Sequence, residues 1–414
     1  MVVVGGRLRG HDEGVGWAGM VPIEFMLFGL TLLGVAVSHK HALRVALIGL
    51  AVITAWKVLV AGFPAGRGLA GLAGHLGHEW VILANLLALL VSFALLARHF
   101  EQSRVPEWMP ALLPVDWKGG FVLLVLIFVL SAILDNIAAA LIGGTVAMRV
   151  FRGRVHIGYV AAIVAASNGG GSGSVLGDTT TTMMWIAGKS PWAVLDAYTA
   201  AIPALLVFGI AASLQQHKFS PIEKDPPGGV AIDWGRIGVV AAILLTAVAT
   251  NVLTNLYYPA VLDHFPVLGA AVFAAVVVTS IWRRADWGIV PDAVKGAVFL
   301  LALVAAASMM PVERLPSPSV GVTFGLGVLS AVFDNIPLTA LALKQGGFDW
   351  GMLAYAVGFG GSMMWFGSSA GVAITRLFPY AQSADGWLKG AWHVPLAYAV
   401  GFGVQWALTG WHPS

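Results

Sequence analysis

The chain contains no cysteine, and only 10% of its 414 residues are charged. The absence of cysteine excludes disulfide bonds, thiolate metal sites and cysteine nucleophiles. Soluble domains average about 25% charged residues, so the low charge argues against a water-exposed surface over most of the chain. The densest basic group is only Arg149, Arg152 and Arg154, which argues against nucleic acid as a partner.

Hydrophobic residues make up 58% of the sequence, and the mean hydropathy is +0.84. Apolar runs long enough to cross a bilayer as helices recur along the whole chain. We therefore expect an all-α integral membrane protein with several membrane-spanning helices, whose main partner is the lipid bilayer.

Two nearly matching stretches, Ser131–Ile137 (SAILDNI) and Ser330–Ile336 (SAVFDNI), place an aspartate and an asparagine inside apolar runs. An acid at the centre of a membrane helix costs about 2.5–3.5 kcal/mol or more, so its usual role is functional. We predict that the two Asp-Asn pairs bind a sodium ion; they are Asp135, Asn136, Asp334 and Asn335. The alternative is that the aspartates only cap half-helices, since Asp and Asn are favoured N-caps.

The repeated motif predicts two copies of one unit, each with about five transmembrane helices, a re-entrant helical hairpin and a broken helix. The predicted parts are an N-terminal tail at 1–20, a first repeat at 21–214, a cytoplasmic linker at 215–235 and a second repeat at 236–410. The hairpins are expected at about 119–150 and 318–345, and the broken helices at about 156–187 and 350–378. The sequence offers two candidates for the first residue of the protein, Met1 and Met20.

The charges of the loops suggest an orientation. If each hairpin enters and leaves on one side, each half crosses the membrane an odd number of times, so the second half is inverted. Most loop lysines and arginines then gather on one face, as the positive-inside rule requires of the cytoplasmic side. Inverted repeats with interrupted helices at corresponding places point to a transport site near the bilayer midplane. We expect a multi-pass protein of the cell inner (plasma) membrane.

The two broken helices carry further polar residues, Ser167 and Asn168 in the first and Ser368 and Ser369 in the second. Glycines beside them permit unwound backbone, which is tolerated at membrane depth only where it is buried or lines a wet cavity. Hydroxyl, amide and carbonyl oxygens then become ligands suitable for an alkali cation. An acid beside them that accepts either a proton or a sodium ion would couple the two ions by competition.

A third acid, Asp178, precedes a run of four threonines, of which Thr179 and Thr180 are candidate ligands beside it. The threonines have a simpler alternative role, which is to satisfy backbone carbonyls in a membrane helix. Lys57 lies in another apolar span and is a candidate counter-charge to one of the acids.

The paired Asp-Asn motifs, the run Ser167–Trp185 and the stretch Gly360–Gly371 resemble the NhaD-type sodium/proton antiporters. That family is part of the ion transporter superfamily, with the arsenite permeases and the citrate and dicarboxylate carriers. The resemblance implies a scaffold and a moving transport subdomain, a homodimer, elevator-like alternating access, Na+ and H+ as transported ions, and no cofactor. The chain departs from the family at Ala138–Ala140, where NhaD-type proteins typically have threonines.

We expect a secondary transporter, not an enzyme, that exchanges sodium or lithium for protons. The alternative is a sodium-coupled carrier of citrate, a dicarboxylate or another anion such as arsenite. Dicarboxylate carriers have Ser-Asn-Thr in both repeats, whereas this chain has Ser167-Asn168-Gly169 and Gly367-Ser368-Ser369. An enzyme is the least supported class, because no nucleophile–base pair or metal-ligand spacing stands out in the sequence.

Overall fold

The computed structural model describes residues 22–38, 41–223, 229–262 and 264–414. These residues form helices and connecting loops, and within them no β-strand is present beyond one isolated bridge between Phe63 and Gly66. The tail expected at 1–20, with both candidate starts, lies outside the described residues. Helices that are long and apolar enough to cross a membrane are Ala42–Ala61, Gly68–Gln102, Pro191–Phe219, Trp234–Tyr257 and Trp287–Ser308. The predicted all-helical, multi-pass membrane architecture is confirmed at this level.

The first half contains ten α-helices and a π-helical turn in the described residues. They are α1 (Ile23–Val37), α2 (Ala42–Trp56), η2 (Lys57–Ala61), α3 (Gly68–Gln102), α4 (Val105–Leu112), α5 (Trp117–Ser131), α6 (Asn136–Val150), α7 (Ile157–Ser172), α8 (Thr179–Ile186), α9 (Pro191–Leu195) and α10 (Tyr198–Phe219).

The α-helices of the second half begin at Trp234, near the end of the segment 215–235 that we expected to be a linker. They are α11 (Trp234–Tyr257), α12 (Val267–Thr279), α13 (Val290–Ser308), α14 (Val320–Ser330), α15 (Asn335–Gln345), α16 (Trp350–Gly360), α17 (Ser369–Leu377), α18 (Ala384–Gly390) and α19 (His393–Thr409).

From α5 in the first half and α14 in the second, the order of the α-helices is the same. The pair α5/α6 is separated by a short break before Asn136, and α14/α15 by a break before Asn335. A broken pair then follows, α7/α8 in the first half and α16/α17 in the second, and a long helix closes each half, α10 or α19. One boundary differs from expectation: the glycine-rich run from Ser167 to Ser172 is helical, and the break in the first half covers Gly173–Asp178 instead.

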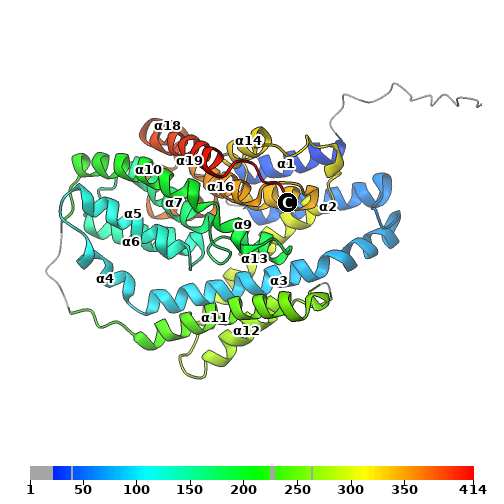
Figure 1. Cartoon of the computed structure of the whole chain (residues 1–414), viewed down its shortest axis with the longest axis horizontal. Coiled ribbons are helices and arrows are strands. Elements are labelled where there is room, and N and C mark those ends of the chain that lie inside the picture. The colour runs from blue at the N-terminus through cyan, green and yellow to red at the C-terminus, as the bar shows by residue number, and fades with distance from the viewer. Residues whose placement is uncertain (1–21, 39–40, 224–228, 263) are drawn as a thin grey trace, which may run out of the picture.

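The closing and broken helices of the two halves pack on each other. α10 runs along α19, α7 packs on α16 and α6 packs on α17. A second group joins α3 to α11, α12 and α13, and α13 also packs on α2. Figure 1 shows α3, α11 and α12 together along one edge of the molecule, away from α7, α16 and α19. The polar breaks therefore lie in a part of the molecule where both halves contribute helices.

Glycines let the hairpin helices approach the broken helices closely. A Cβ at Gly170 of α7 would collide with the carbonyl of Phe128 in α5, and a Cβ at Gly360 of α16 would collide with the carbonyl of Gly327 in α14. The same contact is thus made once in each half. It brings the Asp-Asn break of each half beside the broken helix of that half.

Candidate functional site

Three aspartates and one serine begin the helices that follow the four breaks. Asp135 caps α6 by accepting from the Ile137 amide at 3.1 Å, and Asp334 caps α15 by accepting from the Ile336 amide at 3.1 Å. Asp178 caps α8, and Ser368 caps α17. Capping was the alternative role considered for Asp135 and Asp334, and both do cap. A helix N-terminus carries partial positive charge, so it stabilises an ionised carboxylate placed there.

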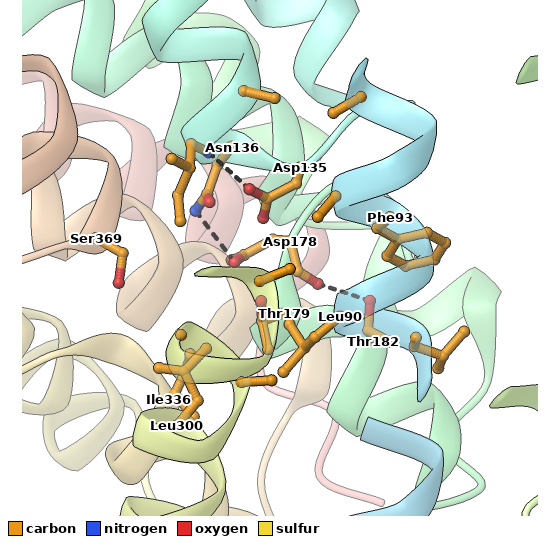
Figure 2. A pocket seen from close by; sticks show the side chains of 18 of the residues that line it. Leu90, Phe93, Asp135, Asn136, Asp178, Thr179, Thr182, Leu300, Ile336 and Ser369 are labelled. Carbon is orange, nitrogen blue, oxygen red and sulfur yellow. Dashed lines mark hydrogen bonds between the residues drawn. The ribbon is translucent and has the colours of Figure 1, made fainter. Parts of the chain in front are cut away.

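The side chain of Asp178 lies between the two Asp-Asn breaks. Asn136 donates to its Oδ1 at 3.2 Å, and Asn335 donates to its Oδ2 at 3.5 Å. Asp178 is only 2% exposed, and the two asparagines that donate to it directly follow Asp135 and Asp334 in the chain. Figure 2 shows Asn136 pointing toward Asp178. The structure therefore brings together the acids that the sequence placed in three separate motifs.

Asn168 connects the two halves at the same place. Its Oδ1 accepts from Asn136 at 3.1 Å, and its Nδ2 donates to Ser362 at 3.0 Å and to Ser368 at 3.1 Å. All four side chains are buried. Ser362 belongs to the network but was not among the predicted residues, although it stands in the Gly-Gly-Ser-Met-Met-Trp stretch that the sequence singled out.

Ser369 and Asp334 form the other side of the site. The Ser369 hydroxyl donates to Asp334 Oδ2 at 3.0 Å. Thr179 lies at the start of α8, and the backbone amide of the buried Thr180 donates to Asp178 Oδ1 at 3.4 Å. Ser167 differs from the others, because its hydroxyl donates to the Val164 carbonyl within α7 and its own carbonyl accepts from Ser131.

The two halves correspond differently from the expected match of Ser167-Asn168 with Ser368-Ser369. Ser131 donates to the carbonyl of Ser167, and Ser330 donates in the same way to the carbonyl of Val357. Further along, Gly171 packs on Gly177 and Asp178, whereas Gly361 packs on Gly367 and Ser368. The matching partners are therefore Ser167 with Val357 and Asp178 with Ser368. The sequence did contain a signal for this match: a glycine precedes the capping residue in both halves, in Gly-Asp-Thr at 177–179 and in Gly-Ser-Ser at 367–369.

A cavity of about 310 Å³ reaches this network. Its polar lining includes Asp135, Asn136, Asp178, Thr179, Asn335 and Ser369. Apolar side chains of α3 such as Leu90 and Phe93 form part of its wall (Figure 2). Among the residues that the structure describes, no lysine, arginine or histidine lines this cavity. Carboxylate, amide and hydroxyl oxygens without a basic partner are a ligand set for a hard cation.

Lys57, the predicted counter-charge, lies elsewhere in the structure. It is 9% exposed, at the start of the π-helical turn η2, and its ammonium lies 5.7 Å from the centre of the Phe63 ring. Within the described residues no ion pair joins Lys57 to Asp135, Asp178 or Asp334. The site thus remains a cluster of acids with amide and hydroxyl partners.

No family model matches the chain. It is 25% identical over 387 residues to Sodium/proton antiporter 1 of Arabidopsis thaliana, an alignment that covers 84% of this chain and 66% of that protein. It is 29% identical over 314 residues to the Na+/H+ antiporter NhaD of Alkalimonas amylolytica, covering 62% of each chain. With the NhaD of Vibrio parahaemolyticus it shares 28% identity over 334 residues, covering 68% of this chain and 78% of the relative. The matches thus span only 66% and 62% of the length of the first two relatives. The resemblance to NhaD-type sodium/proton antiporters that the paired motifs indicated is confirmed.

Proposed function

We propose that this chain is a secondary transporter that exchanges sodium, or lithium, for protons across the inner membrane by alternating access. The observation that carries the proposal is a cavity lined by Asp135 and Asp178, with Asn136 and Asn335 both donating to Asp178 and with no lysine, arginine or histidine among its described lining residues. The relatives named as sodium/proton antiporters support it independently.

The chemistry is competition for the same carboxylates. Asp178 is held by the asparagines that follow Asp135 and Asp334. Ionised carboxylates gathered in this way repel one another, and this repulsion favours the binding of positive charge. A sodium ion that enters the cavity finds carboxylate oxygens of Asp135 and Asp178 and amide oxygens of Asn136 and Asn335. When the sodium ion binds, its positive charge weakens the binding of protons to the acids, and the protons leave. When protons bind, they neutralise the carboxylates, and the ion leaves.

We assign the ion site to the residues predicted from the sequence. They are Asp135, Asn136, Ser167, Asn168, Asp178, Thr179, Thr180, Asp334, Asn335, Ser368 and Ser369. Among them, Ser167 contributes by positioning, because its carbonyl holds Ser131 at the end of α5. Asn168 contributes by orienting Asn136 and Ser368.

We further propose that 21–214 and 236–410 are inverted repeats, that α5/α6 and α14/α15 are re-entrant hairpins, and that 215–235 is a cytoplasmic linker. The shared order of elements and the matched contacts at Gly170 and Gly360 support two related units. The group α3, α11, α12 and α13 would then be the scaffold, and would form a homodimer in the bilayer as the family resemblance implies.

The alternative, a carrier of citrate, a dicarboxylate or another anion, has one observation in its favour. Four helix N-termini meet at the site, and helix N-termini bind anions. In this chain, however, Asp135, Asp178 and Asp334 already occupy three of these N-termini. A carboxylate substrate would meet the carboxylates of Asp135 and Asp178 and no positive side chain among the described residues that line the cavity, so cation exchange is favoured.

The test uses everted membrane vesicles that contain a pH-sensitive dye and are acidified by respiration. Addition of sodium or lithium should dequench the dye in vesicles with this protein, and addition of potassium should have a much smaller effect. The same vesicles should take up no labelled citrate. Citrate uptake without any cation-evoked proton movement would overturn the proposal in favour of the carrier.

A further inference from the structure

A second cavity, of about 440 Å³, lies at one end of the group formed by α3, α11, α12 and α13. Its walls are Gln102 at the end of α3, Arg236 in the first turn of α11, and residues 284–288, which join α12 to α13 and begin the short helical turn η4 (Trp287–Ile289). It shares no lining residue with the cavity of the ion site. The chemistry of its walls therefore needs an explanation of its own.

Hydrogen bonds and ion pairs join the three walls of the second cavity. The Asp233 amide donates to the Ser103 carbonyl at 2.9 Å, which ties the start of α11 to the end of α3. Arg98 of α3 donates through Nε to Asp286 at 3.0 Å and also pairs with Glu101 at 2.9 Å. The cavity is therefore built into the packing of α3 against α11 and against the connection between α12 and α13.

Positive charge exceeds negative charge around the second cavity. Arg236 and Arg283 share one acid, Asp233, whose oxygens lie 3.7 Å and 3.4 Å from their guanidinium nitrogens. Arg284 is exposed and has no carboxylate partner within the part of the chain that the structure describes. When Arg98 and its two acids are included, four guanidiniums meet three carboxylates, and the guanidinium without a partner is that of Arg284.

This arrangement suits a phosphate group that carries one negative charge. Guanidinium groups bind phosphate oxygens through paired N–H donors, and Arg236 and Arg284 both line the cavity, together with Gln102. A phosphodiester has a single charge, which matches the one guanidinium without a partner. The Asp286 carboxylate also lines the cavity. It is paired with Arg98, and it disfavours an anion with more than one negative charge.

The surface beside the second cavity indicates that the phosphate belongs to a lipid. Trp234 is 71% exposed and Trp282 is 62% exposed, and tryptophans gather where a membrane meets water. Val278 and Ile281, which lie just before Trp282 in the chain, are 63% and 88% exposed. Figure 1 shows α11 and α12 along the outer edge of the molecule, where exposed apolar side chains can face acyl chains. Basic pockets between membrane helices are known to bind the headgroups of anionic lipids.

We propose that the second cavity binds the phosphate of an anionic phospholipid, with Arg236 and Arg284 as its ligands and the acyl chains along α11 and α12. A lipid held there contacts the end of α3, the start of α11 and the connection between α12 and α13 at once. Its binding therefore stabilises the packing of these elements, as any ligand of the folded state does. The site lies apart from the acids, so the proposal does not depend on the identity of the transported ions.

The test measures lipid binding to the purified full-length protein after detergent has removed its native lipids. Native mass spectrometry compares phosphatidylglycerol, which is anionic, with phosphatidylcholine, which is zwitterionic, at identical acyl chains. Inorganic phosphate and glycerophosphoglycerol, the headgroup without acyl chains, are the soluble probes. The variant is Arg284→Gln, because Arg284 is exposed and its loss breaks no ion pair among the described residues. The matched control is Arg314→Gln, since Arg314 is also exposed and lies beyond the other end of α13.

Phosphatidylglycerol should bind more tightly than phosphatidylcholine, and Arg284→Gln should weaken its binding by roughly fivefold, the effect of one basic side chain at an anionic lipid surface. Arg314→Gln should leave the binding of both lipids unchanged. Equal binding of the two lipids, an unchanged phosphatidylglycerol affinity in Arg284→Gln, or the same loss in both variants would overturn the proposal. If inorganic phosphate or glycerophosphoglycerol binds as tightly as phosphatidylglycerol, the cavity takes a soluble phosphate compound and the lipid assignment is wrong. The unfolding midpoint of each lipid-free variant separates the loss of the site from the loss of the fold.

Discussion

Asp178 and Ser368 occupy matching positions in the two halves of the chain, and each caps the helix that resumes after a break, α8 or α17. Each follows a glycine that packs on the preceding broken helix, Gly177 on Gly171 and Gly367 on Gly361. The two halves therefore share a backbone plan but differ in charge, because only the first half places a carboxylate at this cap. The single added acid lies where Asn136 and Asn335 converge on it.

Asp178→Asn should abolish sodium-evoked dequenching. Asparagine is as good an N-cap as aspartate, so α8 should still form, but the charge shared between the two Asp-Asn breaks is lost. The matched control is Asp349→Asn, a buried cap at the start of α16 that does not line the cavity of the site. The control should retain exchange. Full activity in Asp178→Asn, at equal expression, would show that this carboxylate takes no part in exchange.

Ser369→Ala should raise the sodium concentration needed for half-maximal exchange. The variant removes a hydrogen bond to Asp334 and a hydroxyl oxygen from the cavity. Hydrogen bonds to charged groups contribute about 1.5–3 kcal/mol, so the increase should be roughly tenfold. Ser383→Ala, which removes the cap of the surface helix α18, is the control. An unchanged sodium dependence would mean that Ser369 neither binds the ion nor couples Asp334 to it.

The helices and the repeated order of elements were predictable from the sequence because apolar runs and the paired Asp-Asn motifs are local signals. We expected the acids to converge because interrupted helices meet near the midplane, and in the structure Asn136 and Asn335, the residues after Asp135 and Asp334, both donate to Asp178. The site acids could be identified from local sequence because an acid in an apolar run has few roles other than capping a helix or binding a ligand.

The position of the first break was not predictable from local sequence. The run from Gly169 to Gly171 looks like unwound backbone, but its small residues instead allow close packing: Gly170 lies against the carbonyl of Phe128, and the helix continues to Ser172. Gly177, which does lie in the break, packs on the carbonyl of Ser131. Which glycine ends a helix and which one packs depends on a neighbouring helix that is remote in sequence. The position of Lys57 was also not predictable from local sequence, because it depends on the π-helical turn η2 and on the contact with the Phe63 ring.

Gly327→Ala should destabilise the protein, whereas Gly325→Ala should not. Both glycines lie in α14, but a Cβ at Gly327 would collide with the Tyr398 hydroxyl and the carbonyl of Ala356, while a Cβ at Gly325 meets nothing within 4 Å. In a helix with free space, alanine is favoured over glycine by about 0.5–1 kcal/mol. Thermal unfolding in detergent, followed by tryptophan fluorescence, should show a lower midpoint only for Gly327→Ala. Equal midpoints would mean that α14 can move away from α16 without cost.

Lys344→Met tests a contact between α15, which is part of the proposed second hairpin, and the end of α13, which is part of the proposed scaffold. The Lys344 ammonium donates to the carbonyls of Ser308 at 2.5 Å and Met310 at 2.6 Å. Methionine retains most of the apolar stem but leaves both part-buried carbonyls without this donor, at a cost of about 1–3 kcal/mol. The unfolding midpoint should therefore fall by several degrees.

The control for Lys344→Met is Lys389→Met. Lys389 pairs with Asp385 at 2.9 Å, but both side chains are largely exposed, and such surface pairs contribute at most about 1 kcal/mol. If Lys344→Met lowers the midpoint and Lys389→Met does not, the bonds from Lys344 help to hold α15 against α13 in this conformation. If exchange in Lys344→Met also becomes faster at saturating sodium, these bonds must break in each transport cycle. An unchanged midpoint together with an unchanged rate would mean that α15 is held against α13 by apolar packing alone.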